Sequence, residues 1–380
     1  MATSPTQPQI LAAARVFTPD ELFSPGWVEV ANGRVMAVGG GPAYRSGAGT
    51  IVDLGDVTIA PGFVDLHAHG GGGASYTDGA QAATLARAMH LSHGSTSGMA
   101  SLVTDTVERL ADQIRALRPL VDRVDLLGVH LEGPWLAPRY RGAHDPSLLR
   151  TPSGEDVDRL LRAGPIAMVT IAPEVPGGLA AICRLVDAGV LVAIGHSDAT
   201  YAEARTAFAE GARILTHMHK AHRPLHHREP GPAQAALGSP GVILEVIADG
   251  VHVHPAVVAD ILRTRPGRVA LVADAMAAAG AGDEDYRLGP LNAVVRGGVA
   301  RIGGPDGPIA GSTLTLDRAL RWAVDSGVEF SVALSAATRI PADVIGRGDL
   351  GRLTPGARAD LVVLDPSLPV TSVMRGCHWI

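Results

Sequence analysis

The feature of this sequence that most limits its possible folds is a repeated order of strand, loop and helix that begins at residue 61. Short apolar segments, each of a length that suits a buried strand, alternate with amphipathic stretches of helical period. Eight such strands are expected, at residues 64–66, 95–102, 125–131, 168–172, 191–195, 213–216, 242–248 and 269–273. Strands that alternate with helices in this way predict an α/β protein with a parallel (β/α)8, TIM-like barrel.

The segments on either side of this repeat indicate a second, smaller unit. Helices are expected at residues 80–94, 107–117, 154–163, 178–188, 201–210, 312–326 and 332–345. Strands are expected before the barrel at 9–17, 27–30, 34–38, 50–54 and 57–60, and after it at 351–353 and 359–365. Asn32-Gly33 between two of them is a strong hairpin signal. We therefore expect a small β-sandwich domain from residues 1–60 and 350–380, and a barrel domain at 61–349.

The first barrel strand ends in the sequence His67-Ala68-His69, followed by four glycines. Side chains two residues apart on a strand point to the same side, so His67 and His69 can converge on one metal ion. The glycines then let the backbone turn away without steric cost. A single pair of this kind is a weak signal, because packing or chance also produces it.

The weight of the metal hypothesis comes from the other strand ends, where the active sites of such barrels lie. Imidazoles and carboxylates, the ligands of zinc and similar divalent metals, follow nearly every expected strand. They are His67 and His69, His130 and Glu132, Glu174, His196 and Asp198, His217, Asp249 and His252, and Asp274. A carboxylate can bridge two metals where an imidazole cannot. Glu132 is the candidate bridge, between a group with His196 and His217 and a group with His67, His69 and Asp274.

Asp274 has two possible roles on sequence grounds. A carboxylate at a strand end can cap the following helix. Beside an activated water molecule, it can instead serve as a general base that later protonates the leaving group. We expect the second role, because a carboxylate beside a metal-bound water molecule is better placed as a general base than as a helix cap.

Composition and charge argue against several classes of protein. The net charge of −6 does not favour nucleic acid or an anionic membrane as partner. Cys183 and Cys377 are far apart and form no CxxC motif, so neither a disulfide framework nor a thiolate zinc site is indicated. The first ten residues lack the apolar core of a signal peptide, and no apolar run reaches transmembrane length. We expect a soluble cytoplasmic protein.

Motifs along nearly the whole chain resemble those of the amidohydrolase superfamily and, within it, of the N-acetylglucosamine-6-phosphate deacetylases. They are PGFVDLHAHG, GVHLEGPWLAP, RGAHDP, IAPE, GHSDAT, HHREPG, ADGVHVHP, LVADAM, AGSTLTLDRAL and GRLTPGARADLVVLD. The resemblance implies a hydrolase of amino sugar metabolism that converts N-acetylglucosamine-6-phosphate to glucosamine-6-phosphate and acetate. It also implies one or two divalent metal ions per subunit, zinc before iron, manganese or cobalt.

The resemblance also implies roles for individual residues. Glu132, His196 and His217 match the family's main metal ligands, and Asp274 matches its catalytic aspartate. His67 and His69 match a second ligand pair that only some members possess. The substrate-binding residues that it implies are His144, Lys220, Ala221, Arg228 and His252. In a homodimer, Arg228 would reach the neighbouring subunit's site, where its planar fork suits a phosphate.

One segment departs from the family pattern. After His217 the family reads close to LFNAM, whereas residues 218–222 here read MHKAH, with Lys220 in place of the asparagine. Lysine can pair with phosphate as a point charge or select another anionic group. Two other interpretations are a loop that faces solvent, and an adventitious metal site formed by the histidines at 219, 222, 226 and 227. The departure leaves open a deacylase of the same mechanism that acts on another N-acyl amino sugar or related molecule.

Two further classes stay as alternatives on sequence grounds. One is a metal-binding relative without catalytic activity, for which the loss of a ligand or of Asp274 would be the signature. The other is a phosphoryl hydrolase, whose relatives commonly carry a carboxylated lysine at the fourth strand, where this chain has Glu174.

Overall fold

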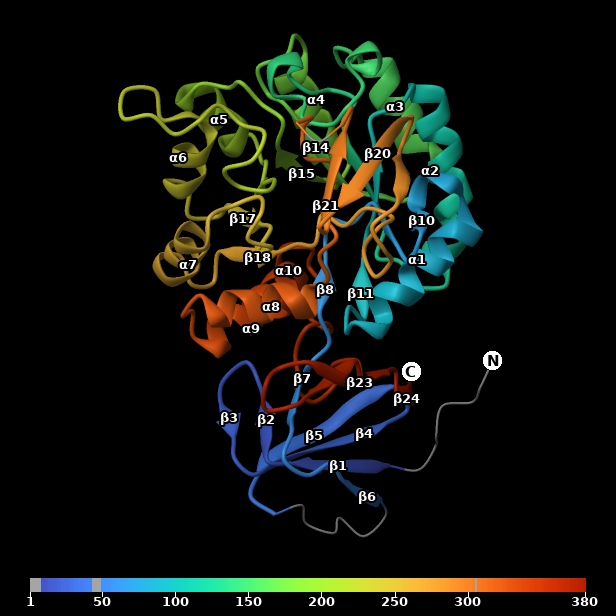
Figure 1. Ribbon diagram of the computed structural model, residues 1–380, viewed down its shortest axis with the longest axis vertical. Coiled ribbons are helices and arrows are strands. Elements are labelled where there is room, and N and C mark those ends of the chain that lie inside the picture. Colours follow the sequence, from blue (N-terminus) through green and yellow to red (C-terminus); the bar gives the residue numbers. More distant parts are fainter. Residues whose placement is uncertain (1–7, 43–48, 305) are drawn as a thin grey trace.

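The computed structural model describes residues 8–42, 49–304 and 306–380, and Figure 1 shows a barrel above a smaller β-layered part. Parallel strands form one continuous sheet in the order β12 (Ala100–Val103), β13 (Val129–Glu132), β14 (Ile166–Ile171), β15 (Leu191–Ile194), β16 (Ile214–Leu215), β17 (Ile243–Val246) and β18 (Val269–Leu271). β8 (Val64–Asp65) pairs in parallel with β11 (Ser97–Gly98), which precedes β12. The main-chain N–H of Asp274 donates to the carbonyl of His67 (2.7 Å), and this bond closes the ring between β18 and β8. The predicted barrel is confirmed.

Helices cover the outside of the barrel (Figure 1). They are α1 (Ala80–Ser92), α2 (Val107–Asp122), α3 (Gly154–Ala163), α4 (Gly178–Asp187), α5 (Tyr201–Ala209), α6 (Gly231–Leu237), α7 (Pro255–Thr264), α8 (Leu316–Asp325), α9 (Phe330–Ala337) and α10 (Arg339–Val344), with short 3-10 turns η1 (Tyr76–Asp78), η2 (Pro138–Tyr140) and η3 (Pro146–Leu148). The start of α5 has a local cause, because Thr200 and Glu203 form a reciprocal capping box. In the described part of the chain, none of these helices has the length and apolar character needed to cross a membrane.

Some helix predictions need correction. The helix expected at residues 332–345 is divided at Thr338, whose φ of −131° and ψ of −84° are not helical, into α9 and α10. The helices α6 and α7 were not predicted. α6 is short and composed mostly of glycine, proline and alanine, so it carries little amphipathic signal.

The smaller part consists of two sheets that share one apolar core. The first has the order β5 (Arg34–Gly40), β4 (Gly26–Ala31), β1 (Gln9–Ala13) and β6 (Thr50–Asp53). The second has the order β24 (His378–Trp379), β23 (Val370–Arg375), β22 (Leu361–Leu364), β7 (Thr58–Pro61), β2 (Arg15–Phe17) and β3 (Leu22–Phe23). Leu11 and Val28 from the first sheet pack in one cluster with Ile59 and Leu361 from the second. Both ends of the chain therefore build this β layer.

The strand predictions for this part were partly wrong. The expected strand at 9–17 is two strands, because the chain passes from one sheet to the other at Ala14. Residues 351–353 form no strand, although Leu353 is buried in the small core. β23 and β24 were not predicted. The domain limits 1–60 with 350–380, and 61–349, stay a prediction, and residues 1–7 lie outside the described ones.

An antiparallel sheet of β19 (Asp285–Leu288), β20 (Leu291–Arg296) and β21 (Val299–Ile302) follows β18 and was not predicted. We call it the β19–β21 sheet. Its apolar face packs on Val103 and Met276, which lie beside the carboxyl ends of the barrel strands. The insertion therefore covers the end of the barrel where the site was expected.

The glycines after His69 form a tight hairpin of β9 (Gly70–Gly71) and β10 (Ala74–Ser75). Gly72 and Gly73 have φ values of +60° and +82°, which side chains rarely adopt. At Gly71 a Cβ atom would come within 2.1 Å of the Met89 side chain on α1. The backbone after the metal-ligand pair therefore lies directly on α1.

His90 on α1 supports this turn and provides a test of stability against pH. Its Nε2–H donates to the carbonyl of Gly70 (2.9 Å), and burial lowers the pKa of His90 from 6.5 to about 4. The unfolded chain therefore binds this proton more tightly than the folded chain. The contribution of neutral His90 to the free energy of unfolding is therefore complete above pH 6.5, and it is lost as the pH falls towards 4. We expect metal-free wild type to lose ~3 kcal/mol more than His90→Gln across this window, measured by urea unfolding. Equal losses would contradict the assignment.

Candidate metal-binding active site

Several of the polar residues expected at the strand ends meet in one small cavity beneath the β19–β21 sheet. Its polar lining consists of His69, Glu132, His144, His196, His217, Lys220, His252 and Asp274. Its apolar cover includes Val103, Leu288 and Ile309. These side chains come from barrel strands far apart in the sequence, which converge at one end of the barrel.

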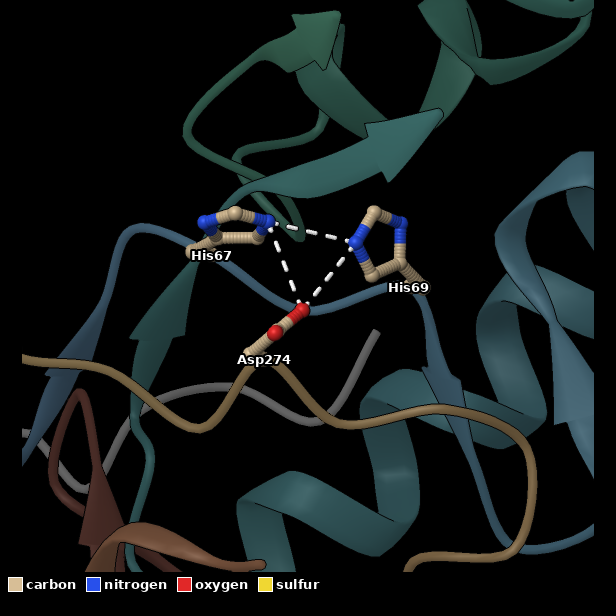
Figure 2. A group of neighbouring side chains, drawn as sticks. All are labelled: His67, His69 and Asp274. Atoms are coloured by element: carbon tan, nitrogen blue, oxygen red, sulfur yellow. Dashed lines mark hydrogen bonds and ion pairs between the residues drawn. The ribbon is translucent and has the colours of Figure 1, made fainter. Parts of the chain in front are cut away.

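His67, His69 and Asp274 form one group that can hold a metal ion (Figure 2). The Nε2 atoms of His67 and His69 are 3.2 Å apart, and they lie 3.5 Å and 3.2 Å from Asp274 Oδ1. Ligands at about 2.0–2.1 Å around a tetrahedral zinc ion are about 3.3–3.4 Å apart. The three atoms therefore have the spacing of one face of such a tetrahedron, and all three residues are buried.

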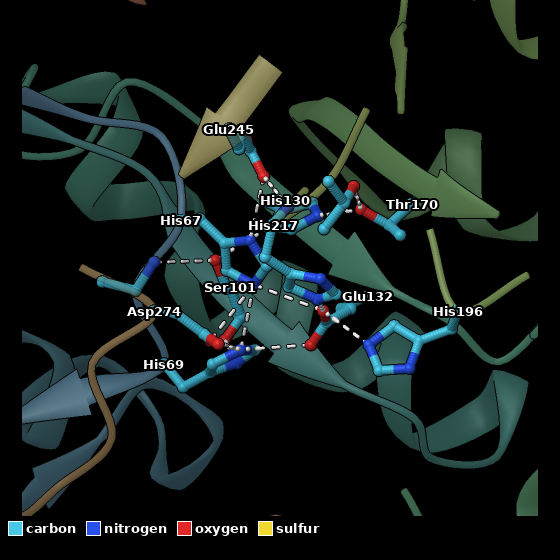
Figure 3. A network of polar contacts seen from close by, with 12 residues as sticks. His67, His69, Ser101, His130, Glu132, Thr170, His196, His217, Glu245 and Asp274 are labelled. Carbon is cyan, nitrogen blue, oxygen red and sulfur yellow. Dashed lines mark hydrogen bonds and ion pairs between the residues drawn. The ribbon is translucent and has the colours of Figure 1, made fainter. Parts of the chain in front are cut away.

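Glu132, His196 and His217 form a second such group, and Glu132 also contacts the first (Figure 3). Glu132 Oε1 is 3.1 Å from the Nε2 atoms of both His196 and His217. Its two oxygens also lie 3.4 Å from His67 Nε2 and 3.2 Å from His69 Nε2. The carboxylate of Glu132 therefore lies between the two groups, and its role as a bridge between two metal ions stays a prediction.

Hydrogen bonds orient the imidazole rings for metal binding. In each ring Nδ1 faces an acceptor, which places the proton on Nδ1 and leaves the Nε2 lone pair directed towards the group, as in metal-bound histidines. The pairs are His69 with the carbonyl of Ser101 (3.2 Å), His196 with that of Tyr140 (2.9 Å), His217 with that of Lys220 (3.1 Å), and His67 with Glu245 Oε2 (3.3 Å). The donor set therefore fits a divalent cation.

The backbone is strained at three of the candidate ligands. His196, His217 and Asp274 have φ values of 49°, 26° and 47°, in a region that non-glycine residues seldom occupy. Tertiary contacts hold these conformations. At Asp274 the N–H donates to His67 and the carbonyl accepts from Ser312, both at 2.7 Å. The direction of these side chains is therefore set by packing between distant segments.

The charges of the cluster favour a cation. Burial opposes ionisation of Glu132 and Asp274, but nearby imidazoles, above all that of His67, hold the pKa of both carboxyls well below its usual range. Conversely, burial opposes protonation of His69, but Asp274 and Glu132 raise its pKa to about 8. The ionised carboxylates therefore attract positive charge to the centre of the site, either protons or a metal ion.

Sequence reasoning missed two buried carboxylates that support the site. Asp65 Oδ1 accepts the N–H groups of His67 (3.2 Å) and Ala273 (3.3 Å), so it ties β8 to β18. Burial raises the pKa of Asp65 to about 7. Glu245 on β17 lies behind His67 and is fully buried. The available signal was a charged residue inside an otherwise apolar strand, which costs free energy unless the charge has a partner.

Other strand-end residues named in the sequence play supporting parts. His130 is buried between the hydroxyls of Ser101 (2.9 Å) and Thr170 (2.8 Å), and its ring packs edge-on against that of His67. Glu174 accepts from the main-chain N–H of Asp198 (2.5 Å), in the loop that follows His196. Neither residue lines the cavity, so they position the ligands rather than contact a bound molecule.

The segment that departs from the family pattern forms a turn beside the cavity. Lys220 lines the cavity and is partly buried, which contradicts the interpretation that this loop faces solvent. Burial lowers the pKa of Lys220, and no carboxylate in the described part of the chain lies within 4.0 Å of its amine. The amine is therefore available to an anionic ligand.

The neighbouring histidines do not form the adventitious metal site that was considered. His222 is buried, and its Nε2–H donates to the carbonyl of Thr216 (2.7 Å). His226 and His227 are exposed. In the described part of the chain, the groups of potential metal ligands do not include these residues.

Most residues implied as substrate-binding lie at the cavity. His144 Nδ1 accepts from the N–H of Thr104 (3.4 Å), so the proton lies on Nε2, 3.4 Å from Glu132 Oε2. Ala221 and His252 line the cavity, and Asp249 holds the His252 ring with a bond of 2.6 Å to Nδ1. Arg228 is exposed in the segment that follows, 2.7 Å from His227 Nε2, and does not line the cavity of its own chain.

Comparisons with known proteins agree with this geometry. Residues 58–378 match the Amidohydrolase family. The N-acetylgalactosamine-6-phosphate deacetylase of Escherichia coli O157:H7 is 34% identical over 373 residues, which cover 96% of this chain and 97% of that protein. The N-acetylglucosamine-6-phosphate deacetylase of Danio rerio is 35% identical over 337 residues, which cover 84% of this chain and 83% of that protein. The crystal structure of N-acetyl-D-glucosamine-6-phosphate deacetylase from Mycobacterium smegmatis matches with 46% sequence identity and a TM-score of 0.93. The match covers 98% of this chain and 100% of that chain. The chain therefore belongs to the amidohydrolase family, in the branch that contains the N-acetylglucosamine-6-phosphate deacetylases.

Proposed function

We propose that this protein is a metal-dependent hydrolase that converts N-acetylglucosamine-6-phosphate and water to glucosamine-6-phosphate and acetate. The observation that carries the proposal is a single cavity with two groups of metal ligands, joined by Glu132, and an unpaired amine on Lys220. The relatives support it, because a variant of the Mycobacterium smegmatis enzyme, 46% identical to this chain, has been solved in complex with N-acetyl-D-glucosamine-6-phosphate.

The metal that we propose is zinc, in one or two ions per chain, with iron, manganese and cobalt as the alternatives that the same ligands accept. His67, His69 and Asp274 would hold one ion, and Glu132, His196 and His217 the other. When bound, such a cation supplies Lewis-acid chemistry: it polarises a carbonyl and lowers the pKa of a water molecule towards about 7.

The residues of the chain would carry the proton transfers. Asp274 is ionised, since its pKa is lowered, and accepts the proton of the attacking water through its carboxylate. It then returns this proton to the departing amine nitrogen as the C–N bond breaks. The Nε2–H of His144 faces the same space and would donate to the carbonyl oxygen of the acetyl group, where negative charge develops.

Lys220 and His252, which also line the cavity, would bind the phosphate. Lys220 presents an unpaired amine there, and His252 is held in place by Asp249. We further propose a homodimer in which Arg228 reaches the partner's cavity, which is supported by its exposure and by its absence from its own cavity. We propose the cytoplasm as its location, because a phosphorylated sugar carries charge and does not cross membranes unaided.

The test is acetate release from N-acetylglucosamine-6-phosphate, unphosphorylated N-acetylglucosamine and N-acetylgalactosamine-6-phosphate, with zinc-loaded and chelator-treated protein. We expect kcat/KM to be highest for the first substrate and to fall at least 10³-fold after chelation, since the proposed chemistry depends on the metal. A preference for N-acetylgalactosamine-6-phosphate would move the assignment to that substrate. No turnover of any of the three by metal-loaded protein would contradict the proposal.

A further inference from the structure

Glu245 is a carboxylate that no part of the proposed reaction uses, yet it contacts His67 on the side of the ring that faces away from the candidate metal group (Figure 3). It is fully buried in β17, between apolar neighbours. Its Oε1 has no hydrogen-bond partner among the described residues, and Oε2 is 3.3 Å from His67 Nδ1. A carboxylate removed from water is costly unless it is paired with positive charge. What Glu245 contributes therefore depends on His67, whose ring faces it.

His67 differs in this respect from the other candidate ligand histidines. The Nδ1 atoms of His69, His196 and His217 face main-chain carbonyls, whereas that of His67 faces a carboxylate. A hydrogen bond to a carboxylate is stronger than one to a neutral carbonyl. It also raises the basicity of the opposite ring nitrogen, and therefore its strength as a metal ligand.

Glu245 also contacts the second group. Its Oε2 accepts the main-chain N–H of His217 (3.4 Å), and its carbonyl accepts that of Met218 (2.7 Å). His217 is one of the residues with a strained backbone, at φ 26°. One carboxylate oxygen therefore contacts the ring of a ligand in the first group and the backbone of a ligand in the second.

We propose that Glu245 is a positioning residue that makes His67 a strong metal ligand and couples the filling of the two groups. The inference rests on the metal dependence of the proposed function. With a cation held by the first group, the Nδ1–H of His67 would donate a stronger hydrogen bond to Glu245. The same carboxylate oxygen then holds the backbone of His217 in its strained conformation, so that occupancy of one group favours the other.

The experiment is titration of metal-free protein with Co²⁺, followed by visible absorption and by calorimetry. We expect Glu245→Gln to weaken the binding of one ion 10- to 100-fold, about the effect of losing an outer hydrogen-bond partner of a ligand. The matched control is Asp317→Asn, because Asp317 on α8 is also buried and lies 3.4 Å from a histidine Nδ1, that of His93. The control is expected to keep both cobalt affinities at the wild-type values.

Two further variants keep the proposal testable. Glu245→Asp retains the charge but moves it back by one methylene group. This variant is expected to lose at least tenfold in affinity for one Co²⁺ ion, and it serves as the test if Glu245→Gln fails to fold. In a His67→Asn background, addition of Glu245→Gln is expected to cause no further loss at the first group, because the residue acts through His67.

The outcomes separate this inference from the proposed function. Wild-type affinity for both ions in Glu245→Gln, or in Glu245→Asp, overturns the inference and leaves the proposed function intact. An equal loss in the Asp317→Asn control also overturns it, because the effect would then be one of general stability. If wild-type protein takes up no cobalt or zinc at all, the proposed function itself fails.

Discussion

Replacement of Asp274 with asparagine is expected to lower kcat for acetate release by roughly 10³- to 10⁴-fold, with a much smaller change in KM. The physical reason is that the ionised carboxylate lines the cavity within the first group of candidate ligands, with Oδ1 3.2 Å from His69 Nε2. Asparagine has nearly the same size but cannot accept the proton of the attacking water. The measurement is steady-state kinetics on zinc-loaded protein, with the metal content of each sample determined by mass spectrometry.

The metal content decides how a loss of activity is interpreted. A variant that retains its metal and loses kcat supports the role of Asp274 in proton transfer, whereas loss of metal together with activity points to its role as a ligand. Asp285→Asn is the matched control, because Asp285 is an exposed aspartate of the β19–β21 sheet and does not line the cavity. Activity of Asp274→Asn within tenfold of wild type would show that another group takes the proton.

Replacement of Lys220 with methionine is expected to lower kcat/KM for the phosphorylated substrate about 10²-fold, mainly through KM, or ~3 kcal/mol in binding. The activity towards unphosphorylated N-acetylglucosamine is expected to change less than twofold, since that substrate has no charge for the amine to pair with. A lost hydrogen bond between charged groups in a partly buried site has an effect of this size. The measurement is kcat/KM for both substrates on the same protein preparations.

The composition of the chain gives this prediction an additional test. Lys220 is the single lysine among the 32 lysine and arginine residues of the sequence. Amine-selective reagents therefore modify only Lys220 and the α-amino group, and inorganic phosphate is expected to protect Lys220. Lys220→Arg, which keeps the charge, should retain more of the preference for the phosphorylated over the unphosphorylated substrate than Lys220→Met does. An equal loss on both substrates would show that the segment serves mainly to hold His217, whose Nδ1 contacts the Lys220 carbonyl (3.1 Å).

The sequence was sufficient for the barrel and for the convergence of the strand-end residues. Both follow from periodicity, because strands of a parallel barrel place their carboxyl ends on one face whatever the details of packing. The position of Glu132 between the two groups and the pairing of His67 with His69 follow from the same rule. The group formed by His67, His69 and Asp274 was therefore within reach of the sequence, although its internal distances were not.

What the sequence did not reveal depends on contacts between distant segments. The positive φ angles of His196 and His217 have no local signature, because glycine is absent and only tertiary hydrogen bonds hold them. The β19–β21 sheet has no helical period and lies outside the strand–helix repeat. Glu245 was overlooked because a single charge does not interrupt an apolar strand pattern, although its burial is what makes it informative.

The β layer built from both ends of the chain has a consequence for synthesis on the ribosome. β22, from the C-terminal end, lies between β23 and β7, and β7 leads within three residues into β8 and the metal-ligand pair. β2 is available to pair with β7 on one side as soon as both have emerged, whereas β22, its partner on the other side, is made only after the whole barrel sequence. The segment that carries His67 gains its final anchorage only when the last few dozen residues leave the exit tunnel, so truncated products would lack a firmly held first barrel strand.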